Sequence, residues 1–223
     1  MCEEILFTGA DGRHEQPSAL ISRLRYDSII NMNKLKQLWR VLTHPRELRL
    51  ALSGLGMRLS GEDSLGGLSQ LETDALVKWV NETGAKTVIE IGTLFGLTAK
   101  ALDSRTPAKV IAVDNFCWNP FGLTVAQHTD FTSRILEGSE VEIICDNSLK
   151  YLSDLKSVDA LVFLDGDHSY DGVKRELEIL KSKGVRLISG HDFGNPLFGV
   201  TRAVREVLGE PDEVVGMCWF KRI

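Results

Sequence analysis

Several short apolar runs of the sequence end in acidic or glycine residues whose spacing suits ligand binding. The first, TVIEIG at 87–92, leads into Glu90-Ile-Gly92-Thr-Leu-Phe-Gly96, the pattern E-x-G-x-x-x-G. Its glycines let the backbone turn tightly against a ligand before a helix begins. The pattern differs from the G-x-G-x-x-G of dinucleotide binders. Taken alone, it also fits a purely structural turn.

The next two apolar runs also end in acidic residues, at the position where each predicted strand ends. KVIAVD ends in Asp114, where a carboxylate can accept hydrogen bonds from the two hydroxyls of a ribose. VEIICD ends in Asp146 and is followed by Asn147, a pair suited to the amino group of an adenine. Each acid alone fits a helix cap about equally well. Three in succession favour a ligand that contains a nucleoside.

Two further apolar runs, ALVFLD at 160–165 and VRLISG at 185–190, also lead into acidic residues. If the two strands are neighbours, about 4.8 Å apart, the carboxylates of Asp165 and Asp192 can converge on one cation. A hard divalent cation prefers such oxygen ligands. The two acids therefore predict a cation site in the same cleft.

A histidine follows the first of these acids, in the segment DGDHSY. His168 would face the same cleft, and its neutral imidazole could take a proton from a substrate hydroxyl. The alternative is structural. Asp165, Asp167 and Ser169 would then cap the following helix, and His168 would pack against Tyr170.

The apolar runs show no clean alternation, which is typical of strands buried on both faces of a parallel sheet. Helical patterns between them supply the crossovers, and the tail DEVVGMCWFKRI predicts a terminal hairpin. The sequence thus predicts an α/β, Rossmann-like doubly wound fold with a mostly parallel sheet and a C-terminal antiparallel edge hairpin. The predicted strands are 87–92, 109–114, 141–146, 160–165 and 185–190, and the predicted helices are 95–103, 124–137, 170–182 and 200–208.

Residues 1–67 differ in character from the rest and predict an N-terminal helical extension ahead of a domain at 68–223. The extension carries a narrow apolar stripe and a glycine-rich linker at 54–67. We expect a lid or contact surface. A solvated helix face and, because Lys and Arg flank Trp39, a peripheral membrane contact are the alternatives. A helix from Ser69 to Val80 should follow, with its core face formed by Leu71, Ala75, Leu76 and Trp79.

The composition bounds the class of protein. Apolar residues make up 43% of the 223 residues, and the net charge of −5 argues against a nucleic-acid binder. No apolar run reaches the roughly 18–20 residues that span a bilayer, and no export signal is present at the N-terminus. The four cysteines are scattered, and we expect Cys145, which lies in an apolar run, to be a buried free thiol. These features predict a reduced, cytoplasmic protein.

Over residues 70–208 the chain resembles a known family. The segments VIEIGTLFGLTAKAL, VIAVDNF, LVFLDGDHSYDGVKRELEIL, LISGHDF and GVTRAV resemble the S-adenosylmethionine-dependent methyltransferases grouped with macrocin O-methyltransferase. Cephalosporin hydroxylase and catechol O-methyltransferase are more distant. The resemblance implies a divalent cation, usually magnesium, on Asp165 and Asp192, with His168 as general base. It also implies a cofactor site formed by Glu90, Gly92, Gly96, Asp114, Asp146 and Asn147.

The sequence departs from the family at one position of the cation site. Catechol-type members follow the second acid with an asparagine ligand, whereas this chain has Phe193 there. Either Asn195, His191 or another residue completes the ligand set, or the cation binds more weakly than in the family.

The activity implied by the resemblance is methyl transfer from S-adenosylmethionine to a hydroxyl of a small molecule. A sugar or glycoside acceptor is expected only by family analogy. Two alternatives remain: a metal-dependent hydroxylase or oxidoreductase on the same fold, and a non-catalytic S-adenosylmethionine-binding protein. The expected partner is a hydroxylated small-molecule acceptor, and we do not expect nucleic acid to bind. The sequence is compatible with a homo-oligomer.

Overall fold

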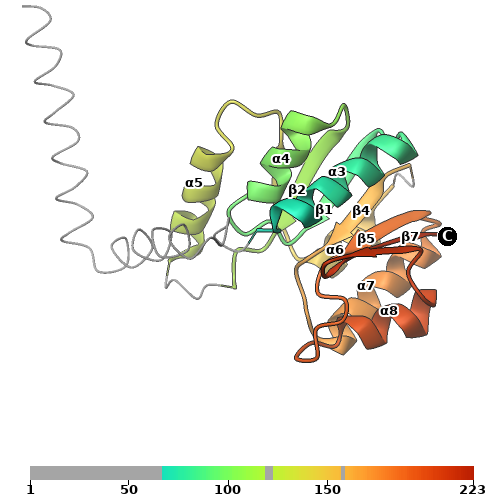
Figure 1. Cartoon of the computed structure of the whole chain (residues 1–223). Helices are drawn as coiled ribbons and strands as arrows, with labels where there is room; N and C mark the ends of the chain where they lie inside the picture. The colour runs from blue at the N-terminus through green and yellow to red at the C-terminus, as the bar shows by residue number, and fades with distance from the viewer. Residues whose placement is uncertain (1–66, 119–122, 157–158) are drawn as a thin grey trace, which may run out of the picture. The chain divides into compact units, whose positions relative to one another are not determined.

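One seven-stranded sheet organises the part of the chain that the computed structural model describes, residues 67–118, 123–156 and 159–223 (Figure 1). Its strands are β1 (Thr87–Ile91), β2 (Lys109–Asp114), β3 (Glu142–Cys145), β4 (Leu161–Leu164), β5 (Leu187–Gly190), β6 (Glu213–Val215) and β7 (Cys218–Arg222). They lie in the order β3-β2-β1-β4-β5-β7-β6. Strands β1 to β5 pair in parallel, and β7 runs antiparallel to β5 and β6. The predicted Rossmann-like fold with its edge hairpin is confirmed.

Helices cover both faces of this sheet (Figure 1). The described helices are α3 (Gln70–Thr83), α4 (Leu97–Arg105), α5 (Val125–Ile135), α6 (Ser148–Asp154), α7 (Tyr170–Ser182) and α8 (Val200–Leu208). Buried residues of α3 and α4 join one apolar cluster, and those of α6, α7 and α8 join a second. The short helix α6 was not among the predicted helices, and Asn147 begins it as its N-cap.

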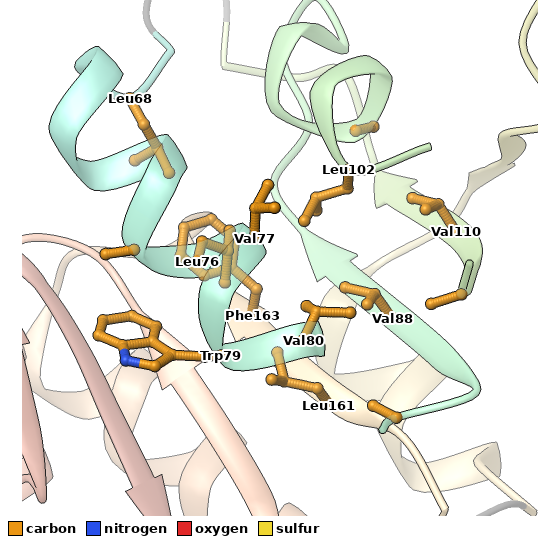
Figure 2. Packing of buried hydrophobic residues seen from close by; sticks show 14 of the residues in the cluster. Leu68, Leu76, Val77, Trp79, Val80, Val88, Leu102, Val110, Leu161 and Phe163 are labelled. Atoms are coloured by element: carbon orange, nitrogen blue, oxygen red, sulfur yellow. The ribbon is translucent and has the colours of Figure 1, made fainter. Parts of the chain in front are cut away.

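Neighbouring residues of the central strands alternate between the two clusters. On β1, Val88 packs under α3 and α4 (Figure 2), whereas Ile89 belongs to the cluster under α7 and α8. On β4, Leu161 and Val162 divide in the same way. Both faces of these strands are therefore buried, which explains why the apolar runs lack alternation.

Two expectations about burial are wrong. Leu71 is 64% exposed, while the next residue, Glu72, is buried on α3. Glu72 turns inward because it closes a capping box with the N-cap residue Ser69. Cys145, expected to be buried, is exposed at the end of β3, a strand that pairs only with β2 among the described strands.

The predicted N-terminal helical extension and its linker lie outside the described residues, apart from Gly67. The boundary between 1–67 and 68–223 therefore stays a prediction. Within the described ranges, no helix is long and apolar enough to cross a membrane.

Candidate active site

A cavity of about 660 Å³ lies beyond the carboxyl ends of β1 to β5, where an open parallel sheet binds its ligands. It collects side chains from five separate strand ends. All the predicted site residues except Gly96 line it: Glu90, Gly92, Asp114, Asp146, Asn147, Asp165, His168 and Asp192. The sheet therefore brings the predicted cofactor residues and the predicted cation and base residues to one space.

Gly92 allows the ends of β1 and β4 to approach each other. Its φ is +87°, and a Cβ atom there would lie 2.4 Å from the carbonyl oxygen of Asp165. Gly96 has φ +77° and begins α4 as its N-cap; a Cβ atom there would lie 2.9 Å from the Leu136 side chain. Gly92 thus shapes the cavity wall, whereas Gly96 positions the helix behind it.

Glu90 is buried beneath the glycine turn. Burial raises the pKa of its carboxyl to about 8, although the hydrogen bond from Thr93 opposes this shift. The Thr93 Oγ1 atom donates that bond to Glu90 Oε2 over 2.5 Å. At neutral pH the Glu90 carboxyl is therefore mostly protonated, and it adds little negative charge to the cavity.

This raised pKa gives a stability prediction. The unfolded carboxyl ionises near pH 4.5, but the folded one only near 8, so the folded state binds more protons between these values and loses stability as pH rises. We expect the free energy of unfolding of Glu90→Gln, relative to the wild type, to increase from pH 5 to pH 8. Urea denaturation at several pH values measures it. A constant difference would mean that Glu90 is ionised in the fold.

Asp114 holds the glycine turn against the end of β2. Its Oδ2 atom accepts the backbone N–H groups of Thr93 and Leu94, each over 2.9 Å. Its Oδ1 atom accepts the backbone N–H of Phe116 over 2.7 Å. Leu94 and Phe116 both have positive φ angles, a conformation that such anchoring helps to maintain. The sequence pattern predicts a ribose-binding acid here but not this structural role.

At the end of β3, the residue that caps the following helix is Asn147 rather than the acid Asp146. Asn147 is the N-cap of α6, and its side chain accepts the backbone N–H of Lys150 over 3.2 Å. Asp146 pairs with the Lys150 ammonium over 2.6 Å. Both residues still line the cavity, so they reach the predicted cofactor region while serving α6.

The two acids after β4 and β5 meet as their spacing predicts. These strands are direct neighbours, with Leu164 opposite Gly190. Asp165, His168 and Asp192 each offer a ligand atom, and these atoms lie within 4.8 Å of one another. Burial raises the pKa of Asp165 to about 7. A cation in this cluster would therefore oppose the cost of ionising a buried carboxyl.

His168 is held by Asp192 and lies just before α7. Its Nδ1 atom is 2.9 Å from Asp192 Oδ2, and this hydrogen bond raises the pKa of the imidazole. The ring stacks on Phe198 with centroids 4.7 Å apart, whereas the Tyr170 hydroxyl donates to Glu206. The N-cap of α7 is Ser169 alone.

Asp192 faces both histidines of the site. Burial alone would raise its pKa, but hydrogen bonds from His168, His191 and Asn195 outweigh burial and hold the pKa well below the ordinary value. Its φ of +61° is a conformation that aspartate tolerates better than most residues. Asp192 is therefore a fixed negative charge facing both histidines.

Sequence reasoning missed Glu72 as a neighbour of the site. His191 Nε2 lies 3.2 Å from Glu72 Oε1, and His191 Nδ1 lies 3.6 Å from Asp165 Oδ1 and 3.7 Å from Asp192 Oδ2. Burial lowers the pKa of His191, but the surrounding carboxylates, Asp192 first, raise it to about 9. The pattern S-x-x-E signals only a helix start, so nothing local connects Glu72 with His191.

Comparisons with known proteins bear on this site. A family model described as a methyltransferase domain matches residues 89–186. Among solved structures, a TDP-rhamnose 3'-O-methyltransferase of calicheamicin biosynthesis is 17% identical, with a TM-score of 0.54 and coverage of 94% of this chain and 96% of that chain. The Podospora anserina methyltransferase PaMTH1, solved with S-adenosylhomocysteine, is 14% identical, with a TM-score of 0.53 and coverage of 71% and 80%. No protein of curated function matches the sequence.

At these identities the solved structures show a shared fold, and the family model adds the domain type. The matched segment runs from β1 through α7 and so contains the glycine turn and the DGDH segment. The resemblance noted in the sequence agrees with this match, since residues 89–186 match a methyltransferase domain.

Proposed function

We propose that the chain transfers a methyl group from S-adenosylmethionine to a hydroxyl of a small molecule. The observation that carries this proposal is one cavity with two chemically different sides. Glu90, Gly92 and Asp114 line the side suited to a nucleoside, and Asp165, His168 and Asp192 line the side suited to an acceptor hydroxyl. The methyl donor supplies a methyl group on a positively charged sulfur, so positioning should provide most of the acceleration.

Asp114 is the main candidate for recognising the ribose. Two of its three backbone hydrogen bonds use Oδ2 and one uses Oδ1. A carboxylate has about four lone-pair sites, which leaves capacity on Oδ1 for a hydroxyl of the ligand. Asp114 would then couple cofactor binding to the shape of the glycine turn.

Asp114→Asn should weaken S-adenosylmethionine binding because it removes the charge and one accepting oxygen. A hydrogen bond to a charged group contributes about 1.5–3 kcal/mol, which corresponds to a loss of about 10- to 150-fold in affinity. Asp146→Asn is the control, since Asp146 pairs with Lys150 at the surface, and its effect should be smaller. Calorimetry measures both, and equal losses would contradict the assignment.

His168 is suited to accept the proton of the acceptor hydroxyl. Because Nδ1 lies against Asp192, the neutral ring carries its proton on Nδ1 and keeps the lone pair on Nε2. Asp192 stabilises the imidazolium that forms when Nε2 takes the proton. The Phe198 ring fixes the plane of the imidazole.

The cluster around Asp165 and Asp192 fits a divalent cation, because it presents buried carboxylates within reach of each other. Asp165 and Asp192 would hold it, and when bound it would supply charge that lowers the pKa of the acceptor hydroxyl. We expect excess chelator to abolish turnover and Asp165→Asn to require far more cation. Full turnover in chelator would make both acids structural.

O-specificity and the acceptor are tested together. Purified full-length protein is incubated with S-adenosylmethionine and matched hydroxyl, amine and thiol acceptors, including sugars and glycosides, and S-adenosylhomocysteine release is measured. Release with hydroxyl compounds alone supports the proposal, with a sugar hydroxyl as the expected acceptor. Release with amines or thiols alone would contradict it.

We also propose that residues 1–67 act as a lid over the acceptor.

A further inference from the structure

His191 lies between carboxylates that come from separate elements, and the proposed methyl transfer does not use it. Its Nε2 atom faces Glu72 of α3 over 3.2 Å. Its Nδ1 atom faces Asp165 and Asp192, over 3.6 and 3.7 Å. The ring therefore links helix α3 directly to the two acids of the cation cluster.

Glu72 is locked in place, so it fixes the orientation of this ring. Its Oε2 atom accepts the Ser69 backbone N–H over 3.0 Å and the Ser69 hydroxyl over 2.7 Å. Its Oε1 atom accepts the Met217 backbone N–H over 2.8 Å. A Cβ atom at Gly216 would lie 2.6 Å from Oε1, so glycine permits the approach. Such a fixed acceptor holds the His191 proton on Nε2.

A carboxylate that accepts one ring N–H while the other nitrogen faces acidic ligands is the usual setting of a metal-binding histidine. With bonds of about 2.1 Å and tetrahedral angles, two ligand atoms lie about 3.4 Å apart. In an octahedral magnesium site they lie about 3.0 Å apart. The separations at His191, 3.6 and 3.7 Å, are somewhat longer than both values, so the ring nitrogen and the two acids lie close enough to converge on one cation.

We propose that His191 Nδ1 is the third protein ligand of the cation, beside Asp165 and Asp192, and that Glu72 positions it. The centre is then a mixed oxygen and nitrogen site, which favours a first-row transition ion such as Mn²⁺ or Zn²⁺ over Mg²⁺. This inference rests on the cation site of the proposed function, not on methyl transfer. Binding exchanges the Nδ1 proton for the cation.

Other described residues suit this role less well. Asn195 donates from Nδ2 to Asp192 and accepts the Leu197 backbone N–H on Oδ1, so its amide is already committed. Glu72, His191 and Cys218 also come close enough to hold an ion. Both oxygens of Glu72 already accept hydrogen bonds, however, and burial raises the pKa of the Cys218 thiol further above neutrality. His168 is the remaining rival, because it contacts Asp192 directly.

Pulsed electron paramagnetic resonance of Mn²⁺ bound to the full-length protein separates the two histidines. We expect coupling to a ligand nitrogen in the wild type, its persistence in His168→Gln and its loss in His191→Asp. Each variant is checked for wild-type circular dichroism and melting. Coupling that vanishes in His168→Gln and persists in His191→Asp would assign the nitrogen to His168 and overturn the proposal. The absence of nitrogen coupling in the wild type would also overturn the proposal.

Calorimetric titration with Mn²⁺ and Mg²⁺ tests the preference and the role of Glu72. The wild type should bind Mn²⁺ more tightly, and His191→Asp should shift the preference toward Mg²⁺. Glu72→Gln should weaken Mn²⁺ binding by about 10- to 100-fold. Asp74→Asn, at an exposed acid of the same helix that pairs with Arg105, should leave it nearly unchanged. Tighter Mg²⁺ binding by the wild type, or no Mn²⁺ binding, would contradict the mixed centre.

These titrations contain neither S-adenosylmethionine nor an acceptor, so they are independent of the proposed reaction. S-adenosylhomocysteine release by a protein without nitrogen coupling would leave the methyltransferase proposal standing and remove His191 from the site. Nitrogen coupling in a protein that releases no S-adenosylhomocysteine would keep His191 in the cation site and contradict the methyltransferase proposal.

Discussion

His168→Gln should lower the turnover number by about 10²- to 10⁴-fold, the range lost when a general base is removed. Glutamine can still donate a hydrogen bond toward Asp192, but it cannot take a proton from the acceptor. Affinity for S-adenosylmethionine should stay nearly unchanged, because the His168 ring contacts Asp192 and Phe198 rather than the glycine turn. Initial rates of S-adenosylhomocysteine release, together with calorimetry, measure both quantities.

A neighbouring acid supplies the control for this variant. Asp167 lies beside His168 but accepts the backbone N–H of Ser169, so Asp167→Asn should keep most of the activity. If His168→Gln also keeps most of its activity, the imidazole serves packing against Phe198, and another group takes the proton.

Gly92→Ala should both destabilise the fold and impair the cofactor side of the cavity. The new Cβ atom would lie 2.4 Å from the Asp165 carbonyl oxygen, at φ +87°. A left-handed backbone costs about 1–2 kcal/mol in a residue with a Cβ atom, and overpacking adds about 1–3 kcal/mol. We therefore expect the free energy of unfolding to fall by about 2–5 kcal/mol, with S-adenosylmethionine binding lost or strongly weakened.

Gly184→Ala separates the two causes. Gly184 has φ +74°, but a Cβ atom there meets nothing within 4 Å. This variant should lose only the backbone part, about 1–2 kcal/mol, and should keep its cofactor affinity. Urea denaturation and calorimetry of both variants provide the comparison. Equal stability losses would show that the ends of β1 and β4 can separate without cost.

The arrangement of Asp165, His168 and Asp192 could be predicted because a parallel sheet imposes it. Apolar runs identify the strands, and the carboxyl ends of neighbouring strands meet at one edge. The structure places β4 beside β5 and brings the three side chains together. Their chemical roles stay predictions, which the variants above test.

Glu72 could not be predicted in the same way, because its environment depends on distant contacts. Helical periodicity placed Leu71 in the core, yet the capping box turns Glu72 inward and leaves Leu71 64% exposed. The partners of Glu72, His191 and Met217, follow it by 119 and 145 positions. For Asp146, the sequence predicts a position at a strand end beside the other acids. It does not predict the ion pair of Asp146 with Lys150.

Titration of the full-length protein with S-adenosylmethionine, S-adenosylhomocysteine and NAD⁺ tests the central claim most directly. The cavity has a glycine turn at Gly92 and an acid at Asp114 but no G-x-G-x-x-G segment for a pyrophosphate. We therefore expect saturable calorimetric binding of both sulfur nucleosides, weakened by Asp114→Asn, and no comparable binding of NAD⁺. Preferred binding of NAD⁺, or no binding of either sulfur nucleoside, would contradict the account.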